Sequence, residues 1–263
     1  MIEINKIYNE NCLDTMKCMP DNFIDLTVTS PPYDNLRDYK GYTFPFEEIA
    51  KELYRITKEG GILVWVVNDS VIQGSETLNS FRQAIYFKDV CGFKVHDTMI
   101  WLKSNFANPS STRYHQLFEY MFIFCKGNIK TFNPIKDKEN ITKFKSLFGV
   151  NTNRLKNGEM KFQKSKKVSQ YGMRGNTWKF NTVGQDNPCT QNSHPAMYPE
   201  KLANDHIISW SDEGHLVYDP FMGSGTTAKM CIANKRNWIG SEISKEYCEI
   251  IKKRIKEVQV KLF

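Results

Sequence analysis

Short apolar runs alternate with segments of helical periodicity along this chain, and that alternation constrains its fold more than any other feature. Apolar runs of the kind found in buried parallel strands cover residues 24–29, 62–67 and 121–125. Between the first two runs, apolar residues recur at helical spacing over residues 46–56, and we expect Gly60-Gly61 to end that helix. Such alternation predicts an α/β fold with a mostly parallel central sheet and helices on both faces.

The remainder of the chain divides at a change in composition. Further strands are expected at residues 95–102, 214–218 and 237–241, and further helices at 202–210 and 245–262. Residues 131–190 are rich in Lys, Asn, Gly and Ser and show weak periodicity, which predicts a small irregular insert. The insert separates a first half, residues 1–130, from a second half, residues 191–263, of one α/β domain.

The insert also holds almost all of the excess charge. The whole chain has 36 Lys+Arg and 29 Asp+Glu, a net charge of +7. Residues 131–190 contain 12 of the basic and 4 of the acidic residues, which leaves 24 basic and 25 acidic residues elsewhere. A basic stretch of this kind is either a solvated surface or a face that follows nucleic-acid phosphates. Charge alone does not decide between the two.

Composition disfavours several classes of protein. No apolar run approaches the ~20 residues that span a bilayer, and residues 1–12 lack the apolar stretch of a signal peptide. We therefore expect a cytoplasmic protein with no membrane partner. The seven cysteines are scattered and include no Cys-x-x-Cys pair, which disfavours both a disulfide framework and a metal site.

The segment Asp219-Pro-Phe-Met-Gly-Ser-Gly-Thr-Thr227 follows an expected strand and opens a helix. Gly223 and Gly225 permit a tight turn that approaches a ligand closely, and the start of a helix offers unpaired N–H groups. Glu242 lies 19 residues after Gly223, at the end of the next expected strand, where a carboxylate can accept hydrogen bonds from ribose hydroxyls. No lysine follows in the triphosphate-binding pattern, so the segment favours a nucleoside-type cofactor.

A second polar segment, Ser30-Pro31-Pro32-Tyr33, directly follows the strand expected at residues 24–29. The two prolines end the strand and hold the chain rigid and extended, as a site requires if it must hold a small planar group closely. Ser30 offers a hydroxyl, Pro31 a carbonyl and Tyr33 a ring that can stack. Taken in isolation, the same tetrapeptide would also suit a stiff surface turn.

Together the two segments resemble the amino-methylating DNA methyltransferases. Thr29-Ser-Pro-Pro-Tyr33 resembles the catalytic motif of that family, and residues 219–227 resemble its cofactor motif. Their order along the chain is similar to that of the β group, a circular permutation of the common methyltransferase order. The resemblance covers most of the chain outside the insert, about 190 of the 263 residues. It extends to Asn11-Cys-Leu-Asp-Thr-Met16, where the family usually has Asp first, to His194-Pro-Ala-Met-Tyr-Pro-Glu-Lys-Leu202, and to Trp101-Leu-Lys103 and Glu119-Tyr120.

The resemblance implies a Rossmann-like fold that transfers a methyl group from S-adenosylmethionine to an exocyclic amino nitrogen of a base flipped out of double-stranded DNA. It implies that residues 131–190 form the target recognition domain, where Arg174 and Trp178 would contact bases unless Trp178 packs in a small core. The implied catalytic residues are Ser30, Pro31, Pro32 and Tyr33. The implied cofactor-binding residues are Asn11, Cys12, Ser30, His194, Pro195, Asp219, Pro220, Phe221, Gly223, Ser224, Gly225, Thr226, Thr227 and Glu242.

Alternatives stay open at this point. Cytosine N4 beside N3 and adenine N6 beside N1 present the same donor–acceptor pair, and the family association of Ser at the Ser30 position favours N4-cytosine over N6-adenine. A catalytically silent DNA-binding module of the same fold, or a methyltransferase acting on RNA or protein, is a further alternative. C5 methylation needs a cysteine nucleophile, and Pro188-Cys189 lies in the insert, far from the catalytic strand. The sequence does not decide between monomer and homodimer, nor whether a cognate restriction endonuclease exists.

Overall fold

The computed structural model describes residues 2–32, 44–106, 109–141, 151–163, 168–181 and 199–261. The chain separates into two compact units. The main unit comprises residues 1–133 and 176–263, and the small unit comprises Pro134–Gly175.

The main unit is built on a sheet in which eight described strands pair side by side. The sheet order is β1 (Lys6–Tyr8), β14 (Asn237–Ser241), β13 (Leu216–Asp219), β2 (Ile24–Thr29), β3 (Thr57–Val67), β7 (Phe118–Cys125), β6 (Lys94–Leu102) and β12 (Thr177–Lys179). The first five strands are parallel, β7 is antiparallel to both of its neighbours, and β12 is parallel to β6. The expected mostly parallel sheet is confirmed.

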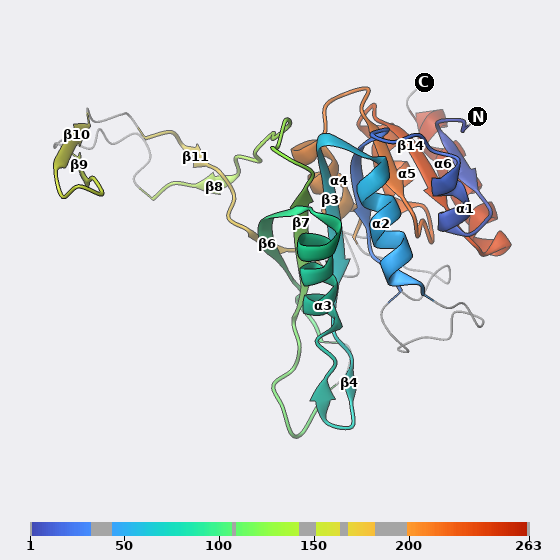
Figure 1. Cartoon of the computed structure of the whole chain (residues 1–263), viewed down its shortest axis with the longest axis horizontal. Coiled ribbons are helices and arrows are strands. Elements are labelled where there is room, and N and C mark those ends of the chain that lie inside the picture. Colours follow the sequence, from blue (N-terminus) through green and yellow to red (C-terminus); the bar gives the residue numbers. More distant parts are fainter. Residues whose placement is uncertain are drawn as a thin grey trace. The chain divides into compact units, whose positions relative to one another are not determined.

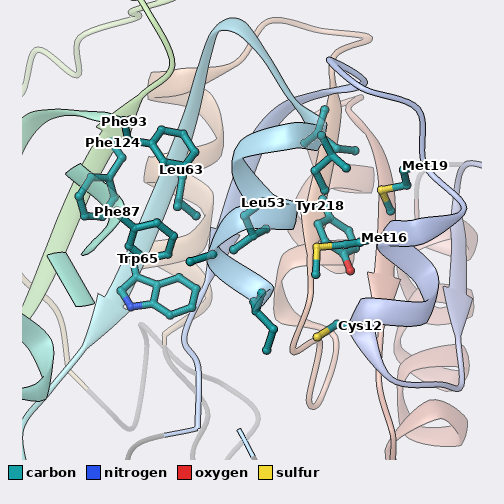
Figure 2. Packing of buried hydrophobic residues seen from close by; sticks show 14 of the residues in the cluster. Cys12, Met16, Met19, Leu53, Leu63, Trp65, Phe87, Phe93, Phe124 and Tyr218 are labelled. Atoms are coloured by element: carbon teal, nitrogen blue, oxygen red, sulfur yellow. The ribbon is translucent and has the colours of Figure 1, made fainter. Parts of the chain in front are cut away.

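Helices cover both faces of this sheet, as expected. The described helices are α1 (Cys12–Lys17), α2 (Phe46–Ile56), α3 (Asn79–Tyr86), the π-helical turn η2 (Phe87–Cys91), α4 (Glu200–Trp210), α5 (Thr226–Ala233) and α6 (Lys245–Lys261). Figure 1 labels α1 to α6 along the chain, and Figure 2 shows α1 and α2 in front of the sheet, with the orange and red helices behind it. On that second face, His206 of α4 contacts the sulfur of Met121 at 3.2 Å. None of the described helices is long and apolar enough to cross a membrane.

A large apolar core lies between the sheet and the helices α1 and α2 (Figure 2). Leu53 of α2, Trp65 of β3, Phe87 of η2 and Tyr218 of β13 are all fully buried there. The rings of Trp65 and Phe87 meet edge to face with centroids 5.1 Å apart, and the indole N–H of Trp65 donates to Gln83 Oε1 at 2.9 Å. Burying one large apolar side chain contributes about 1.5–3 kcal/mol. This core therefore holds strands from both ends of the chain in one sheet.

The end of α2 differs from the expectation that Gly60-Gly61 terminates the helix. The helix ends at Ile56, and Thr57 already begins β3. The hydroxyl of Thr57 donates to the carbonyl of Leu53 at 2.6 Å, and the Lys126 ammonium donates to two further carbonyls of this turn at 2.9 Å. These donors satisfy the carbonyl groups at the end of the helix. No glycine cap is therefore needed to supply N–H partners for them. The prediction was wrong, and the glycine pair lies inside the strand.

Short antiparallel pairs make up the remaining strands. In the main unit, β4 (Val71–Ile72) pairs with β5 (Ser75–Glu76). In the small unit, β8 (Lys138–Glu139) pairs with β11 (Tyr171–Gly172), and β9 (Asn151–Arg154) pairs with β10 (Met160–Gln163). The small unit has little regular structure beyond these pairs in its described residues.

The structure gives partners to both residues that the sequence offered as base contacts. In the small unit, the guanidinium of Arg174 donates to Asp137 Oδ2 at 2.9 Å. Trp178 lies in β12 of the main unit, where it is 5% exposed and its ring centroid lies 4.6 Å from that of His206. Trp178 is thus a core residue of the main unit, which supports the packed tryptophan rather than the base contact, the two interpretations that the sequence left open.

Candidate active site

The predicted site segments follow four neighbouring strands of the sheet. Asn11 follows β1, Glu242 follows β14, the glycine turn at residues 220–225 follows β13, and Ser30 follows β2. Because these strands are parallel, their carboxyl ends share one edge. The connections diverge there, since β13 leads through α5 to β14 on one side and β2 leads through α2 to β3 on the other. Open α/β sheets bind their ligands at such a point.

Asp219, the last residue of β13, ties the two motifs together. Its Oδ1 accepts the hydroxyl of Thr29 at 2.7 Å and the N–H of Phe221 at 3.0 Å. Its Oδ2 accepts the hydroxyl of Thr227 at 2.6 Å. The carboxylate is almost completely buried, and a buried carboxylate needs donors of this kind. Asp219 therefore anchors the glycine turn to the strand that carries Ser30.

The turn itself depends on its glycines. Gly223 has φ +52° and Gly225 has φ +84°, both in the left-handed region that strains other residues. A Cβ added at Gly225 would lie 3.0 Å from Cγ1 of Ile251 in α6. The N–H of Gly223 donates to Glu242 Oε2 at 2.8 Å, so the turn is also held by the acid at the end of β14.

Glu242 is fixed by backbone contacts on both carboxylate oxygens. Besides the N–H of Gly223, it accepts the N–H of Ser244 on Oε1 at 2.8 Å, and its own N–H donates to the carbonyl of Tyr8 at 3.0 Å. Burial raises the pKa of the Glu242 carboxyl above its ordinary value, and the backbone N–H groups of Ser244, Gly223 and Ile243 oppose this shift by stabilising its charge. Each oxygen keeps a further lone pair with which it can accept a hydroxyl.

Asn11 and Cys12 open the helix that follows β1. Asn11 is the N-cap of α1, where its side-chain oxygen accepts the N–H of Leu13 at 2.9 Å. Aspartate caps a helix in the same way, so the departure from the family's usual Asp leaves the local fold intact. Cys12 is buried in the core. Their predicted contacts to the cofactor remain predictions.

The catalytic segment leaves the sheet at a fixed point. Thr29 pairs with Trp65 of β3 and is held by Asp219, and Ser30 comes next. Ser30 and Pro32 are half-buried, and Pro31 is buried. Tyr33 lies outside the described residues.

The other predicted cofactor residues lie in the turn or outside the described residues. Pro220, Ser224, Thr226 and Thr227 are buried. Phe221 is half-buried, with its ring centroid 5.7 Å from that of Phe44. His194 and Pro195 lie outside the described residues.

Sequence reasoning missed a buried group of charged residues behind the turn. Arg254 of α6 donates to Ser224 and to Glu200, the first residue of α4, and Lys229 of α5 also binds Glu200. The available signal was the position of Arg254, three residues after Ile251 on the apolar side of the predicted C-terminal helix.

A glycine turn, an acid after the next strand, and a proline-braced polar segment on the neighbouring strand lie at the ligand-binding edge of an open α/β sheet. Known proteins identify the family. The N6/N4 methyltransferase family model, described as DNA methylase, matches residues 24–253. The chain belongs to this DNA methylase family.

Individual relatives cover most of the chain. It is 52% identical over 240 residues to the orphan methyltransferase M.BamHII of Bacillus amyloliquefaciens, with 90% of each protein covered. It is 29% identical over 267 residues to the type II methyltransferase M.BglII of Bacillus subtilis, covering 94% of this chain and 68% of that protein.

Solved structures share its fold. The PvuII DNA methyltransferase (cytosine-N4-specific) has a TM-score of 0.69 at 20% identity and covers 97% of this chain and 90% of its own. The complex of M1.HpyAVI with SAM has a TM-score of 0.62 at 24% identity and covers 95% of this chain and 98% of its own. The expected methyltransferase fold is confirmed, while the circular permutation remains a prediction.

Proposed function

We propose that the protein transfers the methyl group of S-adenosylmethionine to the exocyclic N4 of cytosine in double-stranded DNA. The hydrogen bond between Thr29 and Asp219 supports this most directly. It couples the glycine turn to the segment that begins at Ser30, so a methyl donor held by the turn would lie beside a base held by the segment.

The residues at this edge fit S-adenosylmethionine. Glu242 has acceptor capacity for the two ribose hydroxyls, and its backbone contacts fix its orientation. Gly223 and Gly225 let the backbone approach the ligand, as the left-handed turn requires. When bound, the cofactor supplies a methyl group attached to a sulfonium sulfur. The neutral thioether left behind makes this sulfur a good leaving group.

The chain's own residues then prepare the amino group for attack. An exocyclic amino nitrogen is a poor nucleophile because its lone pair is delocalised into the ring. The Ser30 hydroxyl and the Pro31 carbonyl accept hydrogen bonds from the two N–H groups, which favours a pyramidal nitrogen whose lone pair points at the methyl carbon. Tyr33 stacks on the flipped base and offsets part of the few kcal/mol that unstacking costs. Positioning and electrostatics supply the acceleration. The nitrogen is cationic and acidic once its bond to the methyl carbon has formed, so it releases its proton to water and no strong general base is needed.

Cytosine is favoured over adenine by the serine at the first position of the catalytic segment. Ser30 stands where N4-cytosine enzymes of the family more often have Ser and N6-adenine enzymes more often have Asp. The PvuII enzyme, which has the same fold, is named as cytosine-N4-specific. N6-adenine methylation is the second candidate, because both bases present the same donor–acceptor pair.

The basic insert, residues 131–190, is proposed as the target recognition region between the catalytic half, residues 1–130, and the cofactor half, residues 191–263. The small unit, Pro134–Gly175, falls within it. Lys136, Lys138, Lys156 and Lys161 are exposed there, as phosphate contacts require.

Product analysis tests the proposal. Duplex DNA of mixed sequence is incubated with the protein and methyl-labelled S-adenosylmethionine, digested to nucleosides and analysed by mass spectrometry. We expect labelled N4-methylcytosine. Labelled N6-methyladenine would instead establish the second candidate, and duplex binding without any methylated nucleoside would indicate a silent DNA-binding module. A parallel reaction with RNA of the same sequence should give no product.

A further inference from the structure

We propose that Arg254 is a positioning residue for the methyl donor, an inference that rests on the proposed function. Arg254 lies in α6, outside every motif that the family resemblance singles out. It joins the glycine turn after β13 to the start of α4, and through this connection it sets the affinity for S-adenosylmethionine.

Both ends of the Arg254 guanidinium are engaged. Its Nη1 donates to the carbonyl of Ser224 at 2.6 Å and to the hydroxyl of the same residue at 2.8 Å. Its Nη2 donates to Glu200 Oε1 at 2.6 Å. The side chain of Arg254 is only 7% exposed, so these charge-assisted bonds are shielded from water. The planar fork therefore fixes the distance and angle between the two segments.

Ser224 is the residue through which this fork acts on the cofactor turn. It lies between Gly223 and Gly225, and two neighbouring glycines give a backbone the greatest conformational freedom. Hydrogen bonds to both the carbonyl and the hydroxyl of Ser224 restrain this turn. The backbone of the turn is then held in place before the ligand arrives, which lowers the entropy cost of binding.

Glu200 keeps the guanidinium in place and has a second partner. Lys229 of α5 donates to both carboxylate oxygens of Glu200, at 2.6 and 2.8 Å. A buried carboxylate that loses its only cation is strongly destabilised. Because Lys229 remains when Arg254 is replaced, we expect variants at Arg254 to fold, which permits a direct binding measurement.

The test compares Arg254→Met and Arg254→Lys with the wild-type chain and with Lys252→Met. Lys252 lies on the same helix but is exposed and pairs only with Glu249 at 2.7 Å among its described contacts, so it is the matched control. The affinity for S-adenosylmethionine is measured by calorimetry on protein shown to be folded by circular dichroism. Kd for duplex DNA without cofactor and KM for each substrate are measured on the same samples.

We expect Arg254→Met to raise Kd and KM for S-adenosylmethionine by about 10- to 100-fold, in line with charge-assisted hydrogen bonds. Kd for DNA should stay within about twofold of the wild-type value, because the hydrogen bonds of Arg254 do not involve the predicted DNA-binding residues. Arg254→Lys should recover part of the loss, since an ammonium can reach one of the two partners. Lys252→Met should match the wild type.

A purely structural role would lower the melting temperature of Arg254→Met while leaving Kd for S-adenosylmethionine unchanged in the folded fraction, and this result would overturn the inference. Should Arg254→Met not fold, Glu200→Gln decides. It keeps the side-chain shape and is expected to raise the same Kd by about 3- to 10-fold, as weakening one charged partner should, and an unchanged Kd overturns the inference. A wild-type chain that binds no S-adenosylmethionine would overturn the proposed function as well.

Discussion

At the scale of single residues, the hydroxyl of Ser30 carries the chemistry of the proposed reaction. Replacing Ser30 with Ala removes one acceptor for the target amino group and leaves the glycine turn untouched. We expect the single-turnover rate to fall by about 10²–10³-fold, with Kd for S-adenosylmethionine unchanged by calorimetry. Ser75→Ala, in the exposed β4–β5 hairpin, is the control and should behave as the wild type. Turnover near the wild-type rate would remove Ser30 from the mechanism.

We expect Glu242 to make the affinity for the cofactor depend on pH. Burial raises the pKa of its carboxyl above the ordinary value of 4.5. As the pH falls through the raised pKa, the carboxyl is protonated and loses an acceptor for the ribose hydroxyls, so the affinity for S-adenosylmethionine should fall at a higher pH than for an ordinary glutamate. Glu242→Gln should bind weakly at every pH and lack this response. Calorimetry at a series of pH values measures the affinity of both proteins. If the affinity of the wild type does not change down to pH 4.5, Glu242 does not bind the ribose hydroxyls as proposed.

The raised pKa of Glu242 has the opposite effect on the stability of the fold, which should fall as the pH rises. A folded carboxyl with a raised pKa binds its proton more readily than the unfolded chain does. Its stabilising contribution is therefore complete below the unfolded pKa and is lost as the pH rises through the folded pKa. Glu242→Gln should remove that part of the pH dependence of the free energy of unfolding.

At the scale of elements, the contact between β2 and β13 is the one on which the site depends. Thr29→Val removes the hydroxyl that donates to Asp219 while keeping the side-chain shape. We expect a loss of about 1.5–3 kcal/mol in the free energy of unfolding, as for a hydrogen bond to a charged group, measured by urea denaturation. The control is Thr27→Val in the same strand. The buried hydroxyl of Thr27 has no hydrogen-bond partner in the described structure, so its loss should be neutral or stabilising. Equal losses in the two variants would contradict the prediction.

The turn before α5 should resist any side chain. Gly225→Ala combines a left-handed φ of +84° with a Cβ 3.0 Å from Cγ1 of Ile251. The backbone strain alone costs about 1–2 kcal/mol, and the contact should add to it and weaken the binding of S-adenosylmethionine. Gly214→Ala isolates the strain, because Gly214 has φ +82° and open space around its Cβ. If both variants lose the same stability and both keep the wild-type cofactor affinity, the contact with α6 does not shape the turn.

At the scale of the whole molecule, the uneven charge predicts how binding to DNA responds to salt. The binding constant for duplex DNA should fall steeply as the salt concentration rises. A plot of its logarithm against the logarithm of the salt concentration should have a slope of about −0.9 per phosphate contact. Replacing Lys136, Lys138, Lys156 and Lys161 with Ser should flatten that slope. The control replaces four exposed lysines of α6, Lys245, Lys252, Lys253 and Lys256, and should leave the slope unchanged. Fluorescence anisotropy at several salt concentrations measures both, and a flat wild-type response would refute the phosphate-binding role.

Local sequence was sufficient where one short segment decides the structure. Residues 24–29 and 237–241 form strands with the predicted bounds, because their apolar runs are buried in the sheet. Local sequence was insufficient where a structural feature depends on a residue far away along the chain. Helix α2 ends at Ile56 with the help of Lys126, about 70 residues further along the chain. Arg254 reads as one more cation of a Lys/Glu-rich helix until the packing of α6 turns it inward.

The sequence by itself determined the class of fold and the two motifs of the site, because strand and helix periodicity and the conformational demands of glycine and proline act within a few residues. Only the tertiary structure decided that β2 and β13 lie side by side and that Asp219 accepts from Thr29 across them. It likewise decided that Trp178 packs against His206 of α4 in the main unit and that Arg254 braces the turn. These depend on which surfaces are buried together, and burial is a property of the whole assembled chain.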